Sequence, residues 1–139
     1  MRIDELPPDA ADFLGGLRLA TIAHPHEPFV NAVPVWFEWT GEAIEFFTQP
    51  GRPKVDRLRR DPRLSVLVSA EVAEPVYWVR VEGRAELHDD AEALVHRLTD
   101  RYLAAQGGEV DGMRDRLLAS APEAIRVRVV PERLWHFAG

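Results

Sequence analysis

The segment 76–88 constrains the fold more than any other part of the sequence, because its residues alternate between apolar and charged over most of its length. One parity holds aliphatic side chains and the other holds charged ones: Val79, Val81, Ala85 and Leu87 against Arg80, Glu82, Arg84 and Glu86. Successive side chains of a β-strand point to opposite faces of the sheet. The alternation therefore predicts a strand with one buried face and one polar face.

Six further segments have the β-branched and aromatic composition of strands, and turns separate most of them. These segments are residues 17–24, 29–39, 43–48, 63–70, 124–130 and 133–137. The spacing of apolar residues predicts helices at residues 8–14, 53–60, 90–105 and 113–120. Six or seven short strands at hairpin spacing predict a mainly β protein, in which a small antiparallel barrel carries flanking helices.

Length and composition narrow the class of protein. The 139 residues suit a single domain spanning 1–139. The chain has no cysteine, which excludes disulfides, cysteine-bound metals and a thiol nucleophile and fits a reducing cytoplasm. No apolar run approaches the roughly 18 residues that span a bilayer, and the acidic start is unlike a signal peptide. We therefore expect a soluble cytoplasmic protein without a membrane partner.

Positive charge is concentrated in one short segment of an acidic protein. The net charge is −6, which argues against a general binder of nucleic acid or of anionic membranes. Residues 52–63 nevertheless hold six bases and two acids, a local charge of +4 against −10 for the rest of the chain. This distribution predicts that the segment holds a small anion.

The sequence TQPGRPK at residues 48–54 has the features of a phosphate site, because it runs from the end of a strand into a helix. The start of a helix has unpaired N–H groups and a partial positive charge. Thr48 adds a hydroxyl, and Gly51 allows a close approach of the backbone. Arg52 and Lys54 add charge, and Lys54 is the only lysine among 17 basic residues, as expected where a compact ammonium is needed. The alternative is an ordinary solvated helix with incidental bases.

The segment NAVPVWF at residues 31–37 predicts a surface for a planar heterocycle. A proline cannot donate to the sheet, so Pro34 places its strand at an edge or at a bulge. The free backbone groups beside it could bind a ring that has its own donors and acceptors, with Asn31 and Trp36 orienting or covering it. The alternative is an edge strand whose aromatic side chains belong to the core.

No constellation of residues predicts an acid, a base or a nucleophile. Ser65 and Ser69 lie within a strand, without the sharp turn of a nucleophile elbow. His24 and His26 lie across a turn and lack a third metal ligand. Three glutamates of one hairpin look like its solvent-facing side chains: Glu38, Glu42 and Glu45. A reaction carried by a bound cofactor would fit this absence.

The order of these segments resembles a known family. The runs LATIAH, NAVPVWFEWTGE, FFTQPGRPKVDRLRRDPRLSVLV and WVRVEGRAEL are similar to the pyridoxamine 5′-phosphate oxidase-like split β-barrel superfamily, over about residues 13–88. Within it, the chain looks most like class B of the flavin/deazaflavin oxidoreductases, which use coenzyme F420. The sequence departs from the family's pattern at Pro53 and at Asp56-Arg57, where Arg-Asn is common.

The resemblance implies a six- to seven-stranded antiparallel split β-barrel of the FMN-binding type, which forms a homodimer with the cofactor in a groove between the subunits. The residues that would hold the cofactor's phosphate are Thr48, Gln49, Gly51, Arg52 and Lys54, the glutamine and glycine through their backbone. The residues that would line the ring are Asn31, Val33, Pro34, Val35 and Trp36. Trp78 would reach the site from the partner subunit.

The resemblance also implies a reaction, in which a hydride passes between the cofactor and a small unsaturated or heterocyclic substrate. FMN needs one phosphate to be held, whereas the tail of F420 carries further glutamyl carboxylates. Four arginines exceed what a single phosphate needs: Arg57, Arg59, Arg60 and Arg63. This excess favours F420 over FMN, unless these arginines pair with nearby acids such as Asp56 and Asp61. A non-catalytic carrier or sensor of the cofactor is a further alternative.

Overall fold

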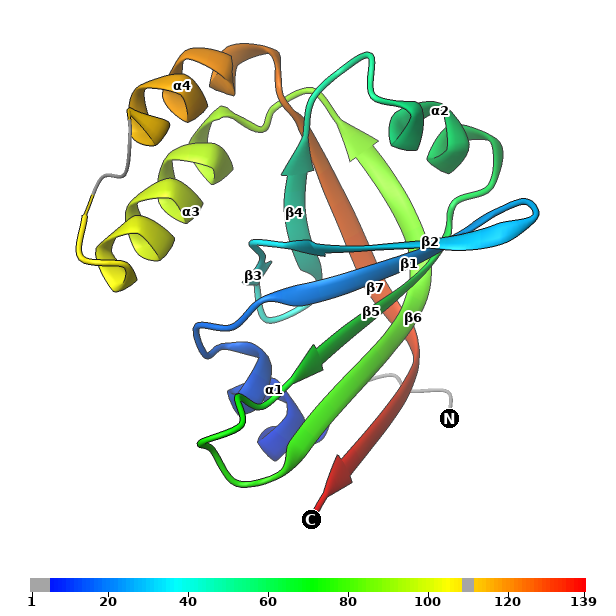
Figure 1. Cartoon of the computed structure of the whole chain (residues 1–139). Coiled ribbons are helices and arrows are strands. Elements are labelled where there is room, and N and C mark those ends of the chain that lie inside the picture. The colour runs from blue at the N-terminus through cyan, green and yellow to red at the C-terminus, as the bar shows by residue number, and fades with distance from the viewer. Residues whose placement is uncertain (1–5, 109–111) are drawn as a thin grey trace.

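The computed structural model describes residues 6–108 and 112–139, which form one curled antiparallel sheet with flanking helices (Figure 1). The strands are β1 (Ala20–His26), β2 (Phe29–Val35), β3 (Glu38–Trp39), β4 (Ile44–Thr48), β5 (Arg63–Ser69), β6 (Tyr77–His88) and β7 (Ile125–Ala138). Their order across the sheet is β2-β1-β5-β6-β7-β4-β3, and every neighbouring pair is antiparallel. The predicted fold class is confirmed: the protein is mainly β, with a seven-stranded split barrel.

The helices lie where the spacing of apolar residues predicts them. They are α1 (Pro8–Leu14), α2 (Pro53–Arg60), α3 (Glu92–Ala105) and α4 (Met113–Ser120), and a 3₁₀ turn, η1, follows at Ala121–Glu123. α3 and α4 lie side by side at one end of the barrel, and α2 leads from β4 into β5 (Figure 1). In the described ranges, none of the helices combines the length and the hydrophobicity that crossing a bilayer requires.

The inner face of the sheet forms the core. Val79 and Val81 of β6 are fully buried, as the alternation in this segment predicts, whereas the side chain of Glu82 lies on the other face. Buried neighbours from the other strands are Ile22, Phe46, Val66, Val68, Val127, Val129 and Leu134. Burying a side chain of this kind contributes roughly 1.5–3 kcal/mol, so this face is the main source of stability.

The C-terminal residues form one long strand, β7, where the sequence predicts two strands at 124–130 and 133–137. The strand continues through Pro131 because the register between β6 and β7 shifts after Glu82, which places Pro131 opposite Gly83. A Cβ atom on Gly83 would overlap the carbonyl oxygen of Val130, so glycine is required at this bulge.

The predicted strand 29–39 is divided in the structure into β2 and β3. Trp36 and Phe37 carry the chain from the end of β2 to β3, which pairs with β4. Within the described ranges, β2 pairs with β1 alone and forms one end of the sheet. The prediction that Pro34 lies in an edge strand is thereby confirmed.

Glu45 contradicts the prediction that the glutamates of the β3–β4 hairpin all face solvent. Glu45 is only 5% exposed, and its Oε2 accepts hydrogen bonds from Arg126 at 2.6 Å and from Arg128 at 3.1 Å. Asp90 and Glu42, both exposed, pair with the same two arginines from outside. The network joins β4 to β7, and the sequence could not reveal it because the arginines lie far along the chain.

Candidate functional site

The turn between β4 and α2 leaves the start of a helix open. Thr48, the last residue of β4, is buried, and Gly51 adopts a φ of +80°, a conformation that glycine takes without strain. α2 begins at Pro53, and no side chain caps it. Pro53 has no N–H, and the N–H of Val55 donates to the carbonyl oxygen of Arg52 at 3.0 Å, so the helix start offers an anion mainly its partial positive charge.

Three bases surround this helix start. Lys54 and Arg57 lie one turn apart on α2 and are both half-buried, and Arg52 directly precedes the helix. Burial, and then the nearby charges of Arg57 and Arg52, lower the pKa of Lys54 below its ordinary value of 10.5. A bound anion would reverse this effect, because its negative charge favours the protonated amine.

The bases around α2 have no acidic partners within residues 6–108 and 112–139. No ion pair there involves Arg52, Lys54, Arg57, Arg59 or Arg60. The Nε atom of Arg57 is buried and has no hydrogen-bond partner among the described residues. A buried donor without a partner is destabilising, and an oxygen of a bound anion would satisfy it. The residues present therefore fit a phosphate group.

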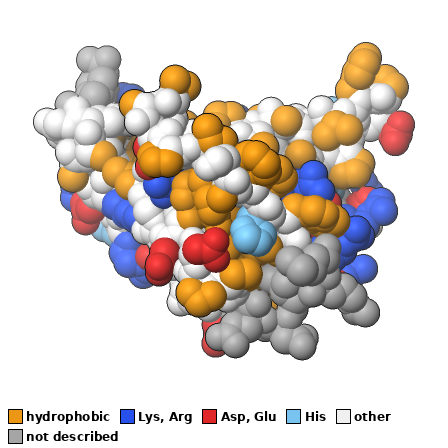
Figure 2. Space-filling view, turned by 90° about the horizontal axis from the view of Figure 1, so that it is seen from below, with side chains coloured by type: hydrophobic (Ala, Val, Ile, Leu, Met, Phe, Trp, Pro, Cys, Tyr) orange, Lys and Arg blue, Asp and Glu red, His pale blue; other side chains and the backbone are white. Residues whose placement is uncertain are grey.

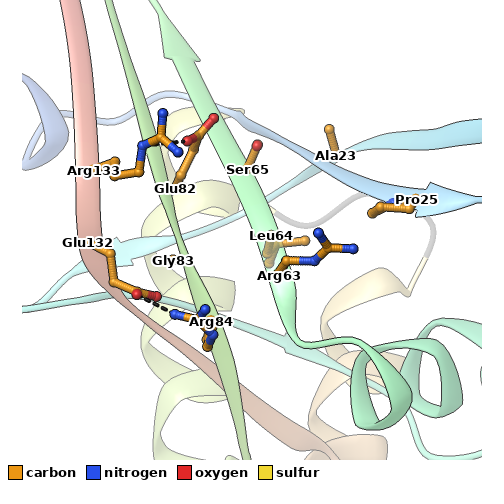
Figure 3. A pocket seen from close by; sticks show the side chains of 10 residues that line it. All are labelled: Ala23, Pro25, Arg63, Leu64, Ser65, Glu82, Gly83, Arg84, Glu132 and Arg133. Atoms are coloured by element: carbon orange, nitrogen blue, oxygen red, sulfur yellow. Dashed lines mark hydrogen bonds and ion pairs between the residues drawn. The ribbon is translucent and has the colours of Figure 1, made fainter. Parts of the chain in front are cut away.

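A second basic region, on the outer face of the sheet, is already neutralised. Its cavity of about 340 Å³ lies over β1, β5, β6 and β7 (Figure 3). Each of its three arginines has a carboxylate partner: Arg63 with Asp61, Arg84 with Glu132, and Arg133 with Glu82. Hydrogen bonds from Arg63 lower the pKa of Asp61 to about 2. Arg63 therefore pairs with Asp61, as the alternative interpretation of the sequence expects. Arg57, Arg59 and Arg60 have no such partner in the part of the chain that the structure describes.

His24 holds the end of α2 against the sheet. Its buried side chain donates a hydrogen bond from Nε2 to the carbonyl oxygen of Asp61, at 2.7 Å, where α2 ends. His24 lies opposite Asn31 in the β1–β2 register, so the two side chains share a face. The described residues contain no group of three side chains that could hold a metal ion.

The residues of β2 that the sequence places around a ring alternate between two faces. Val33 and Val35 pack against the core, and Asn31 lies on their face. Pro34 is exposed on the opposite face. Because β2 is an edge strand, it offers a ligand mainly its backbone groups rather than the side chains of its valines.

Trp36 is held in place by Tyr102 of α3. The two rings stack at 5.1 Å between centroids, with 7° between their planes. The buried hydroxyl of Tyr102 lies 2.6 Å from the carbonyl oxygen of Arg18, to which it donates, and accepts from the N–H of Phe37 at 3.2 Å. Burial raises the pKa of Tyr102, which keeps the hydroxyl protonated. Tyr102 thus fixes both the indole and the backbone that follows it.

Replacing Tyr102 with phenylalanine is expected to destabilise the protein by about 1–3 kcal/mol, because backbone groups of Arg18 and Phe37 lose their partner. The melting temperature should fall by several degrees, and the fluorescence of the tryptophans should change. The control is Tyr77→Phe, whose hydroxyl binds the exposed Asp9 at 3.1 Å and should matter little. Equal losses in the two variants would contradict this role of Tyr102.

An apolar cavity of about 380 Å³ brings the two predicted segments together. Its lining residues are Leu19, Pro34, Val35, Trp36, Phe47, Met113 and Leu117. Three of them belong to the segment 31–37, and Phe47 directly precedes Thr48. The turn also contacts the helix above the cavity, because Nε2 of Gln49 donates to Oγ of Ser120, the last residue of α4, at 3.0 Å.

The structure does not bring Trp78 to this cavity. Trp78 lies on the outer face of β6, stacked on Phe137 of β7 with centroids 6.3 Å apart. Five residues around the cavity are absent from the predicted set: Leu19, Phe47, Tyr102, Met113 and Leu117. The spacing of apolar residues places Tyr102 on the apolar face of the predicted helix 90–105. The sequence does not indicate its contact with Trp36, because that contact depends on how α3 packs.

A curled antiparallel sheet, a basic helix start after β4 and an apolar cavity beside an edge strand define a split β-barrel of the cofactor-binding kind. The chain belongs to the pyridoxamine 5′-phosphate oxidase family, whose model matches residues 8–134. This is a family of flavin-binding oxidoreductases.

Several solved structures share the fold. A protein described as an F420 reductase has 20% identity and a TM-score of 0.76, over 94% of this chain and 98% of that one. A FAD- and heme-binding protein from Mycobacterium smegmatis has 19% identity and a TM-score of 0.70, over 98% and 72%. A conserved hypothetical protein from Mycobacterium tuberculosis has 27% identity and a TM-score of 0.68, over 99% and 89%. No curated protein matches the chain.

Proposed function

We propose that the protein is a reductase that transfers a hydride between coenzyme F420 and a small unsaturated or heterocyclic substrate. The observation that carries this proposal is the group of bases at the start of α2 that have no acidic partner among the described residues, together with the buried Nε of Arg57, which lacks a hydrogen-bond partner there. Membership of a flavin-binding oxidoreductase family supports it. A cytoplasmic location is part of the proposal, since a chain without cysteine suits a reducing compartment.

The turn from β4 to α2 would hold the phosphate of the cofactor. Lys54 and Arg52 would contribute charge-assisted hydrogen bonds, and Thr48 its hydroxyl. The backbone N–H groups of Gln49 and Gly51 would add further donors. Gly51 has a φ of +80°, a conformation that a residue with a side chain would adopt only with strain. Small, fixed donors of this kind orient a ligand as well as bind it.

The edge of β2 would hold the ring. Backbone groups of residues 31–36 would take its hydrogen-bonding edge, and Trp36, fixed by Tyr102, would limit how far the ring can tilt. The bound cofactor supplies the hydride chemistry, which no side chain of the site provides.

The choice of F420 over FMN rests on the number of unpaired bases. Beyond Arg52 and Lys54, three arginines of α2 have no acidic partner in the described part of the chain: Arg57, Arg59 and Arg60. They would suit the glutamyl carboxylates that extend beyond the phosphate of F420. FMN is the second candidate, because the same turn would hold its single phosphate and a structural neighbour binds FAD.

The proposal includes a homodimer with the cofactor at the subunit interface. Phe137, Leu67 and Val76 are large apolar residues that are exposed on a single chain. Figure 2, seen from the end that carries α1 and the C-terminus, shows hydrophobic side chains gathered between charged ones. Exposed apolar patches commonly mark interfaces. Trp78 lies beside Phe137, so a second subunit packed here could receive Trp78 in its own site.

The proposal is tested by titrating the cofactor-free protein with F420 and with FMN, followed by absorbance and tryptophan fluorescence. We expect a lower Kd for F420, and a Kd that falls further as glutamyl residues are added to its tail. Oxidation of the reduced cofactor is then measured with a panel of enones and quinones. Tighter binding of FMN would favour the second candidate. Inertness toward every acceptor would favour a carrier or sensor, and binding of neither cofactor would overturn the proposal.

A further inference from the structure

The cavity beside Trp36 is lined by apolar side chains alone. None of its seven lining residues carries a charge, and their side chains are aliphatic, aromatic or thioether. They come from β2, the link between β2 and β3, β4, α4 and the chain before β1, so the cavity is built by segments far apart in the sequence. A charged ligand entering it would lose water and find no partner, whereas a neutral apolar ligand would gain from leaving water.

α4 closes this cavity loosely. None of its residues is buried, although the neighbouring α3 buries six. Its apolar side chains Met113, Leu117 and Leu118 are only half-buried. Met113 and Leu117 line the cavity, so a molecule bound in it would complete the burial of both side chains. Methionine also adapts readily to ligands of different shape.

The cavity continues directly from the proposed cofactor site. It shares Pro34, Val35 and Trp36 with the segment that would hold the ring, and Phe47 precedes the phosphate-binding turn. Its volume of about 380 Å³ lies within the range of small-molecule sites. A molecule bound here would therefore lie next to the ring.

We propose that this cavity binds the substrate, that it selects neutral and predominantly apolar molecules, and that Met113 and Leu117 of α4 set their size. The inference rests on the proposed function and narrows its substrate class. Within that class, carboxylated or phosphorylated analogues are excluded by the apolar lining rather than by a repelling charge.

The binding test uses N-phenyl-1-naphthylamine, a neutral apolar dye whose fluorescence increases on leaving water. We expect Leu117→Asp to weaken its binding at least tenfold. The matched control is Leu118→Asp, on the same helix and equally half-buried but outside the lining, which should change the Kd less than threefold. Because α4 has no buried residue, both variants should fold, and their melting temperatures check this. Equal effects on dye binding would overturn the proposal.

The activity test compares 4-phenyl-3-buten-2-one with the analogue that carries a carboxylate at the para position of the phenyl ring. The two compounds share the same enone. We expect kcat/KM to be at least tenfold higher for the neutral ketone, and Leu117→Lys to reduce that ratio. Equal use of both ketones by the wild-type protein would overturn the proposal. So would loss of F420 and FMN binding in Leu117→Asp, because the cavity would then hold the ring itself. Failure of the proposed function is distinct: the wild-type protein would bind neither cofactor, while the dye titration would still report on the cavity.

Discussion

Replacing Lys54 with alanine is expected to weaken the binding of F420 or FMN by roughly 10- to 100-fold. A hydrogen bond to a charged group contributes about 1.5–3 kcal/mol, and each 1.4 kcal/mol is a factor of ten in Kd. Lys54 is half-buried between Arg52 and Arg57, so the substitution removes charge from the centre of the cluster. A fluorescence titration measures the Kd of the variant, and its melting temperature is recorded alongside.

The control for this prediction is Arg59→Ala, which removes the same charge from an exposed residue of α2. Its Kd for FMN, which lacks the glutamyl tail that Arg59 would contact, should rise less than about threefold, because exposed charges are screened by solvent and salt. Equal losses in the two variants would show that the cofactor is attracted by general charge and not held at Lys54.

The pH dependence of cofactor binding is a second test of the role of Lys54. The anion binds the protonated amine, and the pKa of Lys54 lies below 10.5. As the pH is raised, the amine should therefore lose its proton, and Kd should rise, already below pH 10.5. Lys54→Arg stays charged up to about pH 12, so its Kd should stay flat over the same range. A wild-type Kd that is as flat as that of the arginine variant would contradict the assignment.

Replacing Glu45 with alanine is expected to lower the free energy of unfolding by about 2–4 kcal/mol. Removing one partner of a buried ion pair leaves charge without compensation, which typically costs about 3–5 kcal/mol. The loss should be somewhat smaller here, because Arg126 keeps Asp90 and Arg128 keeps Glu42. Denaturant unfolding measures the change. Because β4 leads into the turn that is proposed to hold the phosphate, affinity for the cofactor should fall as well.

The matched control is Glu42→Ala, which removes the outer partner of Arg128. The side chain of Glu42 is 82% exposed, and exposed ion pairs contribute little. We expect a change below about 0.5 kcal/mol. A loss as large as that of Glu45→Ala would mean that the network is not organised around the buried carboxylate.

The elements of the fold were largely predictable, because each strand and helix displays its pattern within its own residues. The alternation in 76–88 predicts both β6 and its buried face. The continuity of β7 was not predictable, because Pro131 fits only where Gly83 of another strand forms a bulge. The burial of Glu45 was missed for the same reason, since its partners lie on β7.

The candidate site was predictable only where it is local. The bases at the start of α2 lie within one short segment, so the sequence reveals both their charge and their helix. Only the structure could show that Arg63 has an acidic partner and that Arg57 has none within residues 6–108 and 112–139. The apolar cavity required it too, because Trp36, Phe47 and Leu117 meet only after α3 and α4 have packed. The role of Trp78 stays a prediction, since a second chain would have to bring it to the site.

An open sheet edge exposes a protein to aggregation. Among the residues that the structure describes, nothing pairs with the outer side of β2, so its N–H and C=O groups form a row, a template onto which a strand of another molecule could add. Pro34 lies one residue before the end of that row, where it offers no N–H and its ring obstructs an incoming strand. The residue that leaves backbone free for a ligand thus also guards the chain against fibril growth.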